Sequence, residues 1–377
     1  MNKKLSVLFL CGWYPSRVLP YNGDFIQRHA EAVSLKHDVS IIHIISDKNC
    51  KKNIEIESKI INGIQTHIAY LKPLSNTIYK NFMFYKAYKL LLNKVNYFDI
   101  IHLNEVYPFG VFCLYAKFFQ KRKYIISEHF TGYLSFSKTK INYFHQQISK
   151  LIIKKASVVC TVSDYQKKDL IASGYKGNYE TVGNIVDTKL FIPKKKETDF
   201  LKLLHVSSLK DNHKNIKGML QVAKLLDNKL NYFEWKFIGG YGSEYEDFIR
   251  ELDFKNATIS FFNQQSHLEM IHHLQEASIC ISFSNYETFG IVIAESIACG
   301  TPVIATNTGI ASDFETLPFC KVIDVNDKEL LYSSILNYKT IFADLNTNYM
   351  HTFIKSKFSK KAISDKFSSI YHKSIKS

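Results

Sequence analysis

The sequence predicts an α/β protein with two doubly wound, Rossmann-like domains that face a central cleft. Short runs rich in β-branched residues alternate with helical periods along the 377 residues, which is typical of parallel sheets covered by helices. The chain is long for one domain and suits two of about 150–200 residues. The strand pattern restarts near Lys202, after the charged segment 193–199, so we expect domains at residues 1–190 and 200–354.

The first half contains apolar runs that are predicted to be buried parallel strands. They cover residues 4–11, 38–45, 99–103, 123–128 and 157–162. Residues 24–36 and the long stretch after Ser75 have helical periodicity. Residues 54–71 are predicted to form a hairpin, because Asn62-Gly63 suits a two-residue turn between strands.

The second half repeats this alternation. Its predicted strands are residues 202–207, 232–239, 257–262, 278–283 and 301–306, and its predicted helices are residues 215–227, 243–252, 266–276 and 290–299. In doubly wound sheets, ligands bind at the carboxyl ends of the strands. We therefore expect the functional residues at strand ends.

The net charge of +15 is distributed unevenly. Residues 1–190 carry 27 Lys and Arg against 13 Asp and Glu, a net +14, whereas residues 191–377 carry 22 against 21, a net +1. This asymmetry indicates that the first half meets an anionic partner: phospholipid head groups, a phosphorylated acceptor or nucleic acid. A lysine-rich composition without any partner is the alternative.

The seven cysteines are scattered, odd in number and without a CxxC pair. We expect core thiols in a reducing cytoplasm, not a disulfide framework or a zinc site. The apolar run near the N-terminus is about seven residues long and lacks a small-residue cleavage site, so we expect a first strand, not a signal peptide. No apolar run approaches the roughly 20 residues of a membrane-spanning helix.

Two glutamates enclose an apolar segment in ETFGIVIAE, residues 287–295. The predicted loop 286–290 joins a strand end to a helix start, where free backbone N–H groups favour a phosphate. Glu287 would stand at this site, and Glu295 would lie about 12 Å further along the helix. A nucleotide sugar has matching hydroxyl groups at both ends and a diphosphate between them. Alternatively, Glu287 offsets the helix dipole and Glu295 is a surface residue.

The chain resembles the family 4 retaining glycosyltransferases of GT-B fold along nearly its whole length. The Glu-x7-Glu segment 287–295 carries the resemblance most strongly. Further similar segments are residues 12–33, 127–133 (SEHFTGY), 161–170, 181–191 (TVGNIVDTKLF), 235–244 and 358–373. The last resembles the helix that crosses back onto the N-terminal domain, so residues 355–377 are expected to pack there.

The resemblance implies roles for individual residues. Glu295 would hold the donor ribose, Glu287 the sugar, and Lys214 the leaving diphosphate. The predicted catalytic residues are thus Glu287, Lys214 and His129, and His129 would contact the donor sugar. The predicted donor-binding residues are Glu295, Phe289, Gly290, Ile291, Gly23, Ser208 and Asn184.

The sequence departs from the family pattern at three positions. Ser208 stands where the family usually has an arginine. Either Lys210 or another basic residue takes the place of this arginine, or the diphosphate is bound less strongly. Ile185 replaces the usual glycine in the 181–191 element, and Ile310 follows Gly309 where a paired glycine is expected.

The expected activity is transfer of a hexose-type sugar from a UDP- or GDP-sugar to a hydroxyl of a glycan or lipid-linked acceptor, in polysaccharide or glycolipid synthesis. Retention is implied by the resemblance alone. No Asp-x-Asp motif ends a predicted strand, so we expect neither a metal nor another cofactor. We expect a cytoplasmic protein, peripheral on the inner face of an anionic membrane through its basic half.

Three rival functions remain from the sequence. The missing arginine makes a non-catalytic nucleotide-sugar-binding protein plausible. A GT-B sugar-nucleotide epimerase would use a similar donor site without an acceptor. A nucleic-acid-binding protein would explain the charge, but no recognisable RNA or DNA module and no concentrated basic stripe supports it, so we expect no nucleic acid partner.

Overall fold

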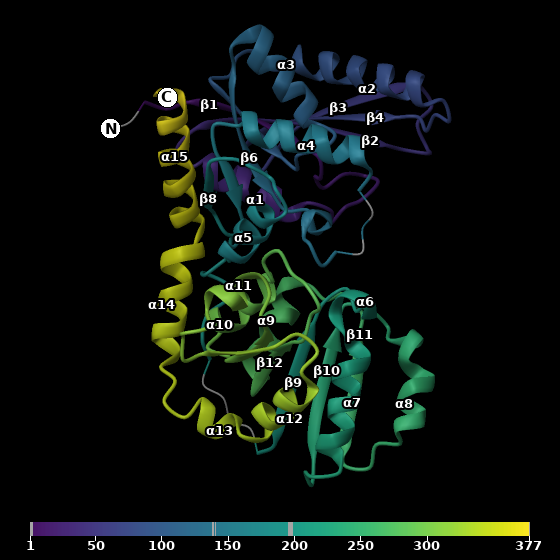
Figure 1. The fold of residues 1–377 in the computed structure, drawn as a ribbon, viewed down its shortest axis with the longest axis vertical. Helices are drawn as coiled ribbons and strands as arrows, with labels where there is room; N and C mark the ends of the chain where they lie inside the picture. Colours follow the sequence, from purple (N-terminus) through teal and green to yellow (C-terminus); the bar gives the residue numbers. More distant parts are fainter. Residues whose placement is uncertain (1–2, 138, 140, 195–198, 377) are drawn as a thin grey trace. The chain divides into compact units, whose positions relative to one another are not determined.

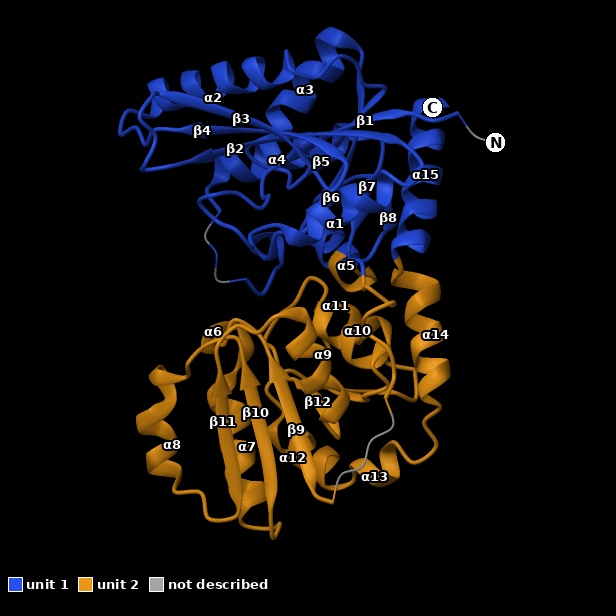
Figure 2. Ribbon diagram, turned by 180° about the vertical axis from the view of Figure 1, so that it is seen from behind, with its two compact units in different colours: residues 1–162, 167–185, 360–377 blue, residues 163–166, 186–359 orange. Residues whose placement is uncertain are grey.

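A computed structural model describes residues 3–137, 139, 141–194 and 199–376. The chain divides into two compact units (Figure 2). The first holds residues 1–162, 167–185 and 360–377, and the second holds residues 163–166 and 186–359. Residues 195–198 of the predicted linker lie outside the described residues.

The first unit is built on an eight-stranded sheet of order β3-β4-β2-β1-β5-β6-β7-β8 (Figure 1). Its strands are β1 (Ser6–Cys11), β2 (Asp38–Ser46), β3 (Ile54–Ile61), β4 (Ile64–Leu71), β5 (Ile100–Asn104), β6 (Lys123–Glu128), β7 (Val159–Thr161) and β8 (Tyr179–Thr181). Neighbouring strands are parallel except in the β3–β4 hairpin. The predicted hairpin turn is confirmed: Asn62 and Gly63 both have positive φ, as a type I′ turn requires.

Helices cover both faces of this sheet. On one face, α2 (Thr77–Leu92), α3 (Gly110–Gln120) and α4 (Tyr143–Lys155) share one hydrophobic core with α5 (Asp164–Ala172). On the other, α1 (Asp24–Val33) and α15 (Lys360–Lys376) pack together over a second core. A short 3₁₀ turn, η1 (Thr131–Tyr133), follows β6. No helix among the described residues is both long and apolar enough to cross a membrane.

The second unit has a six-stranded, all-parallel sheet of order β11-β10-β9-β12-β13-β14. Its strands are β9 (Leu201–Val206), β10 (Phe233–Ile238), β11 (Ala257–Phe262), β12 (Ile279–Ser282), β13 (Val303–Thr306) and β14 (Cys320–Ile323). The strand order reverses between β9 and β12. In open α/β sheets, ligands bind beside the carboxyl ends of the strands at such a reversal.

Nine α-helices and one 3₁₀ turn accompany this sheet within the described part of the second unit. They are α6 (Asp211–Lys214), α7 (Ile216–Asp227), η2 (Ser243–Tyr245), α8 (Glu246–Leu252), α9 (His267–Glu276), α10 (Ile291–Ala298), α11 (Gly309–Asp313), α12 (Lys328–Leu336), α13 (Tyr338–Ile341) and α14 (Thr347–Phe358). Ser266 caps α9 in a capping box with Glu269.

Several details differ from the sequence prediction, including the helices α6, α11, α12, α13 and α14, which were not predicted. The strands β8 and β14 were not predicted. They are only partly buried and form no continuous apolar run, unlike the equally short strands β7, β12 and β13. The predicted helix 243–252 begins as the 3₁₀ turn η2. The C-terminal helix starts at Lys360 and not at residue 355, because Ser359, with ψ 155°, is extended and separates α14 from α15. All seven cysteines are free and buried, as predicted.

Candidate functional site

The loop from β12 to α10 in the second unit presents the first glutamate of the sequence motif. Gly290 caps α10 with φ 83°, a left-handed conformation that glycine adopts without strain. The helix therefore begins at Ile291, where the first backbone N–H groups have no partner within the helix. Phe289 is buried beneath this turn, and Ile291 is half-buried. This arrangement suits an anion, as the sequence predicts.

Glu287 is a buried carboxylate with three polar neighbours. Lys214 forms an ion pair with its Oε1 atom, and the Ser284 hydroxyl donates to the same oxygen at 2.9 Å. His213 Nε2 lies 3.9 Å from Oε2. Burial by itself would raise the pKa of Glu287, but the charge of Lys214 and these neighbours outweigh it and lower the pKa. Glu287 is therefore ionised at neutral pH.

The short helix α6 holds the loop that carries Glu287 through hydrogen bonds. The backbone N–H of Asn285 donates to the His213 carbonyl at 2.8 Å, and its side chain donates to the Asn212 carbonyl at 3.1 Å. His213 Nε2 bonds the Tyr286 carbonyl at 2.7 Å, and the two rings stack at 4.3 Å. His213 and Ser284 were not predicted from the sequence. Their positions, one residue before Lys214 and three before Glu287, were the available signals.

Gly309 supports the same loop from α11. A Cβ atom at this position would lie 2.5 Å from the Phe289 carbonyl oxygen and 3.0 Å from Glu287 Cβ. The backbone N–H of Ile310 donates to that carbonyl at 2.8 Å. Gly309 also has a positive φ of 55°, so both close packing and backbone conformation require glycine.

Glu295 lies on α10 and is only 5% exposed, which excludes the alternative that it is a surface residue. Ser208, in the place of the family's arginine, is exposed after β9. Lys210 is also exposed and directly precedes α6. Asn215, the C-cap of α6, has a left-handed backbone with φ 55°. Lys214 is thus held at the end of a single helical turn.

The other three predicted site residues belong to the first unit. His129 follows β6 and is buried against the rings of Phe25 and His29, at 4.6 and 5.6 Å. Burial, followed by the charges of His29 and His102, holds its pKa well below the ordinary value, so the ring is neutral. Its Nε2 atom has no hydrogen-bond partner among the described residues.

Gly23 and Asn184 are buried in the first unit as well. A Cβ atom on Gly23 would lie 2.6 Å from the Trp13 carbonyl carbon, so glycine is needed for the loop after β1 to close on itself. Asn184 follows β8, and its Oδ1 atom has no hydrogen-bond partner within the described residues.

Two acidic residues at strand ends of the first unit were also not singled out from the sequence. Glu128 accepts backbone N–H groups of Val106, His129 and Phe130 at 2.7–2.9 Å, yet burial raises its pKa to about 7. Glu105 has a left-handed backbone with φ 75°, and burial together with Glu128 raises its pKa to about 9. The signal was their position at strand ends: Glu128 is the last residue of β6, and Glu105 directly follows β5.

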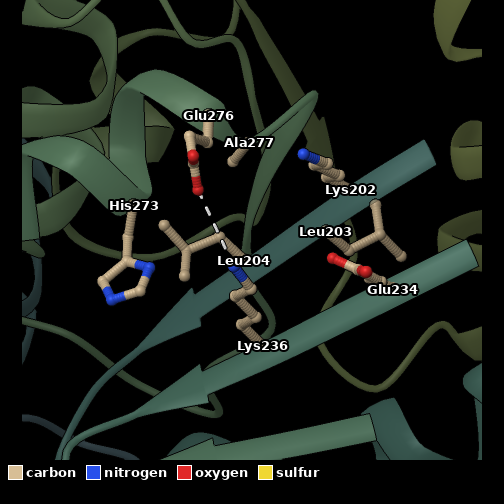
Figure 3. A pocket seen from close by; sticks show the side chains of 8 residues that line it. All are labelled: Lys202, Leu203, Leu204, Glu234, Lys236, His273, Glu276 and Ala277. Atoms are coloured by element: carbon tan, nitrogen blue, oxygen red, sulfur yellow. Dashed lines mark ion pairs between the residues drawn. The ribbon is translucent and has the colours of Figure 1, made fainter. Parts of the chain in front are cut away.

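A small cavity of about 10 Å³ lies between β9, β10 and the end of α9 (Figure 3). Its lining includes Lys236 and Glu276, an ion pair at 3.7 Å, but none of the predicted site residues. This volume suits about one water molecule and no sugar. Among the described residues, no group of three or more His, Cys, Asp or Glu is arranged to hold a metal ion.

Two family models match the chain. The model described as "Glycosyl transferases group 1" matches residues 186–332, and the one described as "Glycosyltransferase Family 4" matches residues 27–190. An uncharacterized 41.2 kDa protein in the cps region of Klebsiella pneumoniae is 24% identical over 265 residues, which are 63% of this chain and 71% of that protein.

Solved structures share the fold of the whole chain. Sucrose-phosphate synthase from Thermosynechococcus elongatus has a TM-score of 0.77 at 16% identity, covering 98% of this chain and 99% of that one. A glycosyltransferase from Rickettsia africae has a TM-score of 0.72 at 19% identity, covering 100% of both chains. HepE from Anabaena, solved in complex with UDP-glucose, has a TM-score of 0.72 at 14% identity, covering 98% and 100%.

Proposed function

Because the chain belongs to the family 4 glycosyltransferases of group 1 type and GT-B fold, we propose that it transfers a hexose-type sugar from a UDP- or GDP-sugar to a hydroxyl group of an acceptor, with retention of configuration. The observation that supports a donor site is the buried Glu287 near the start of α10, which Lys214 and Ser284 contact and whose loop is bound by α6. Such a preorganised ion pair suits a ligand that carries both hydroxyl groups and a diphosphate.

The donor would bind along α10. Backbone N–H groups of Phe289, Gly290 and Ile291 meet the diphosphate, and Glu295 accepts hydrogen bonds from the ribose hydroxyls. Glu287 accepts hydroxyl groups of the sugar. Lys214, already beside Glu287, neutralises the leaving phosphate, and exposed Lys210 substitutes for the arginine that Ser208 replaces.

The transfer itself would need little covalent chemistry from the protein. The acceptor oxygen bonds to the anomeric carbon on the face from which the diphosphate leaves, and the acceptor proton passes to the departing phosphate oxygen. Charge develops on that phosphate and on an oxocarbenium-like sugar, so fixed charges and dipoles supply most of the stabilisation. The neutral His129 would contact the donor sugar. Lys214 and the α10 N-terminus meet the phosphate charge, so the proposed reaction needs no metal.

The proposed acceptor is a glycan or a lipid-linked sugar at the cytoplasmic face of an anionic membrane. The net charge of +14 in residues 1–190 supports an anionic surface. The relative from the cps region of Klebsiella pneumoniae supports a role in cell-surface polysaccharide synthesis.

A thermal-shift screen against UDP-, GDP- and ADP-sugars tests the donor site, since a ligand that binds only the folded protein raises the melting temperature. We expect a shift with one nucleotide class, lost in Glu295→Ala and kept in the matched control Glu315→Ala, whose side chain is exposed. No shift with any sugar nucleotide would contradict the proposal.

Turnover distinguishes the transferase from its rivals. We expect a product of unchanged anomeric configuration and a rate that EDTA does not alter. Donor binding without turnover would indicate a binding protein, and donor conversion without an acceptor would indicate an epimerase. An inverted anomer would overturn retention.

A further inference from the structure

The helical layer formed by α2, α3 and α4 exposes large apolar side chains on the side opposite its core. The exposed residues recur at helical spacing: Ile78, Phe82 and Tyr85 on α2, Val111, Tyr115, Phe118 and Phe119 on α3, and Tyr143, Phe144 and Leu151 on α4. Three of them are among the most exposed apolar residues described, with Ile78 at 83%, Tyr143 at 77% and Phe119 at 76%. A monomeric soluble protein rarely leaves such a face uncovered.

These three helices form one continuous layer. Their inner sides share one hydrophobic core, and the rings of Tyr88 on α2 and Phe112 on α3 stack at 3.8 Å. The Lys117 ammonium of α3 donates to the Lys155 carbonyl of α4 at 2.5 Å. The layer therefore presents its exposed side chains as one surface, which we name the outer helical face (the helices α2, α3 and α4 are labelled in Figure 1).

The outer helical face carries only one sign of charge. No Asp or Glu occurs in α2, α3 or α4, whereas the three helices contain seven lysines. Some lysines lie directly beside the aromatic rings: the Lys89 ammonium is 5.1 Å from the Tyr85 ring centre, and that of Lys155 is 5.9 Å from Phe118. Aromatic rings between lysines are typical of surfaces that enter the interface of a lipid bilayer.

We propose that the outer helical face docks flat on a bilayer of anionic phospholipid, with its aromatic side chains in the head-group region and its lysines on the lipid phosphates. This inference rests on the proposed function, since docking would bring the enzyme to a lipid-linked acceptor. A second protein would need carboxylates to match these lysines, and a second copy of the same face would place lysine against lysine. The charge therefore favours an anionic lipid surface as the occupant.

Sedimentation of the full chain with vesicles tests the docking. We expect binding to phosphatidylglycerol–phosphatidylcholine vesicles at low salt, and little binding to phosphatidylcholine alone. Each lysine at the surface contributes about a fivefold factor in the partition coefficient at low salt, so the triple variant Lys80→Gln, Lys86→Gln, Lys89→Gln should bind roughly 100-fold more weakly. Phe118→Ser with Phe119→Ser should weaken binding by about tenfold or more.

Matched variants on the second unit serve as controls. Lys229→Gln, Lys339→Gln, Lys355→Gln removes the same charge from exposed positions, and Leu225→Ser with Leu268→Ser removes exposed apolar residues. Both controls should keep vesicle binding. The proposal would be overturned if a control lost as much vesicle binding as its matched variant, or if the protein bound neutral and anionic vesicles equally. It would also be overturned if the protein formed a dimer in vesicle-free solution and the Phe118/Phe119 variant dissociated that dimer.

Donor binding separates failure of this inference from failure of the proposed function. The outer-face variants should keep the melting temperature of the wild type and its shift with the nucleotide sugar. Vesicle binding without any donor shift would support the docking and contradict the transferase. A donor shift without vesicle binding would overturn the docking alone.

Discussion

Breaking the ion pair between Lys214 and Glu287 should destabilise the second unit measurably. Only 13% of the Lys214 side chain and 11% of the Glu287 side chain are exposed. Lys214→Met removes the positive charge and keeps most of the apolar volume, which leaves a buried carboxylate with the Ser284 hydroxyl as its remaining close donor. Breaking a buried pair in this way costs about 3–5 kcal/mol, and the remaining hydrogen bond favours the lower end, about 3 kcal/mol.

The double variant Lys214→Met, Glu287→Gln should recover much of this loss, since it leaves no unpaired charge. We expect it to lie within about 1 kcal/mol of the wild type, so that the coupling between the two sites is about 2 kcal/mol or more. Urea unfolding followed by Trp235 fluorescence in a Trp13→Phe background measures this, because Trp235 is then the only tryptophan and is fully buried in the second unit.

The pH dependence gives a second, independent signature. Without Lys214, burial becomes the main influence on Glu287 and raises its pKa above the unfolded value. When a carboxyl group has a higher pKa in the folded than in the unfolded protein, the folded protein loses stability as the pH rises through the folded pKa. The loss of unfolding free energy in Lys214→Met should therefore be largest at pH 8 and smaller at pH 5. A deficit that is equal at both pH values, or a double variant as unstable as the single one, would refute the reasoning.

Three further results are expected. Gly309→Ala should lower stability by more than about 2 kcal/mol and weaken donor binding, because its Cβ would collide with the Phe289 carbonyl. Gly63→Ala, also at a positive φ (79°) but with no atom within 4 Å, should cost only about 1 kcal/mol; equal losses would contradict this. Burial lowers the pKa of several histidines to about 4, among them the fully buried His29, His43 and His205. Their stabilisation is present above pH 6.5 and is lost as the pH falls toward 4, by about 2 kcal/mol each between pH 7 and 5. The raised pKa values of Glu105 and Glu128 act in the opposite direction over this range, so the test is NMR titration of the individual imidazoles, and a midpoint near pH 6.5 in the native protein would contradict the prediction. All seven cysteines are buried, so Ellman's reagent should label none within minutes in the native protein and all seven in urea; rapid native labelling would show that the cores open.

The α/β class and most elements followed from periodicity. Short apolar runs such as 6–11 and 38–46 favour strands of a sheet covered on both faces, and Asn62-Gly63 specifies its turn by local backbone preference. Strands β8 and β14 were not predicted because they are only partly buried and lack a continuous apolar run, so that pairing with a neighbouring strand defines them.

The candidate site was likewise predicted only in part from the sequence. The Glu-x7-Glu motif identified Glu287, Glu295 and the start of α10, because local rules govern a strand, a glycine and a helix that follow one another. The partners of Glu287 come from α6, 73 residues earlier, and the contact that requires Gly309 comes from α11.

The sequence by itself therefore determined the class of fold, the repeated strand–helix order, the uneven charge and the position of the glutamate motif, all of which depend on neighbouring residues or on composition. Only the tertiary structure decided that Lys214 and His213 meet Glu287, that Ser208 is exposed, and that α2, α3 and α4 join their aromatic residues and lysines into one face. These features depend on which distant segments the sheets bring together, and strand order is set by packing across the whole unit and not by any local preference.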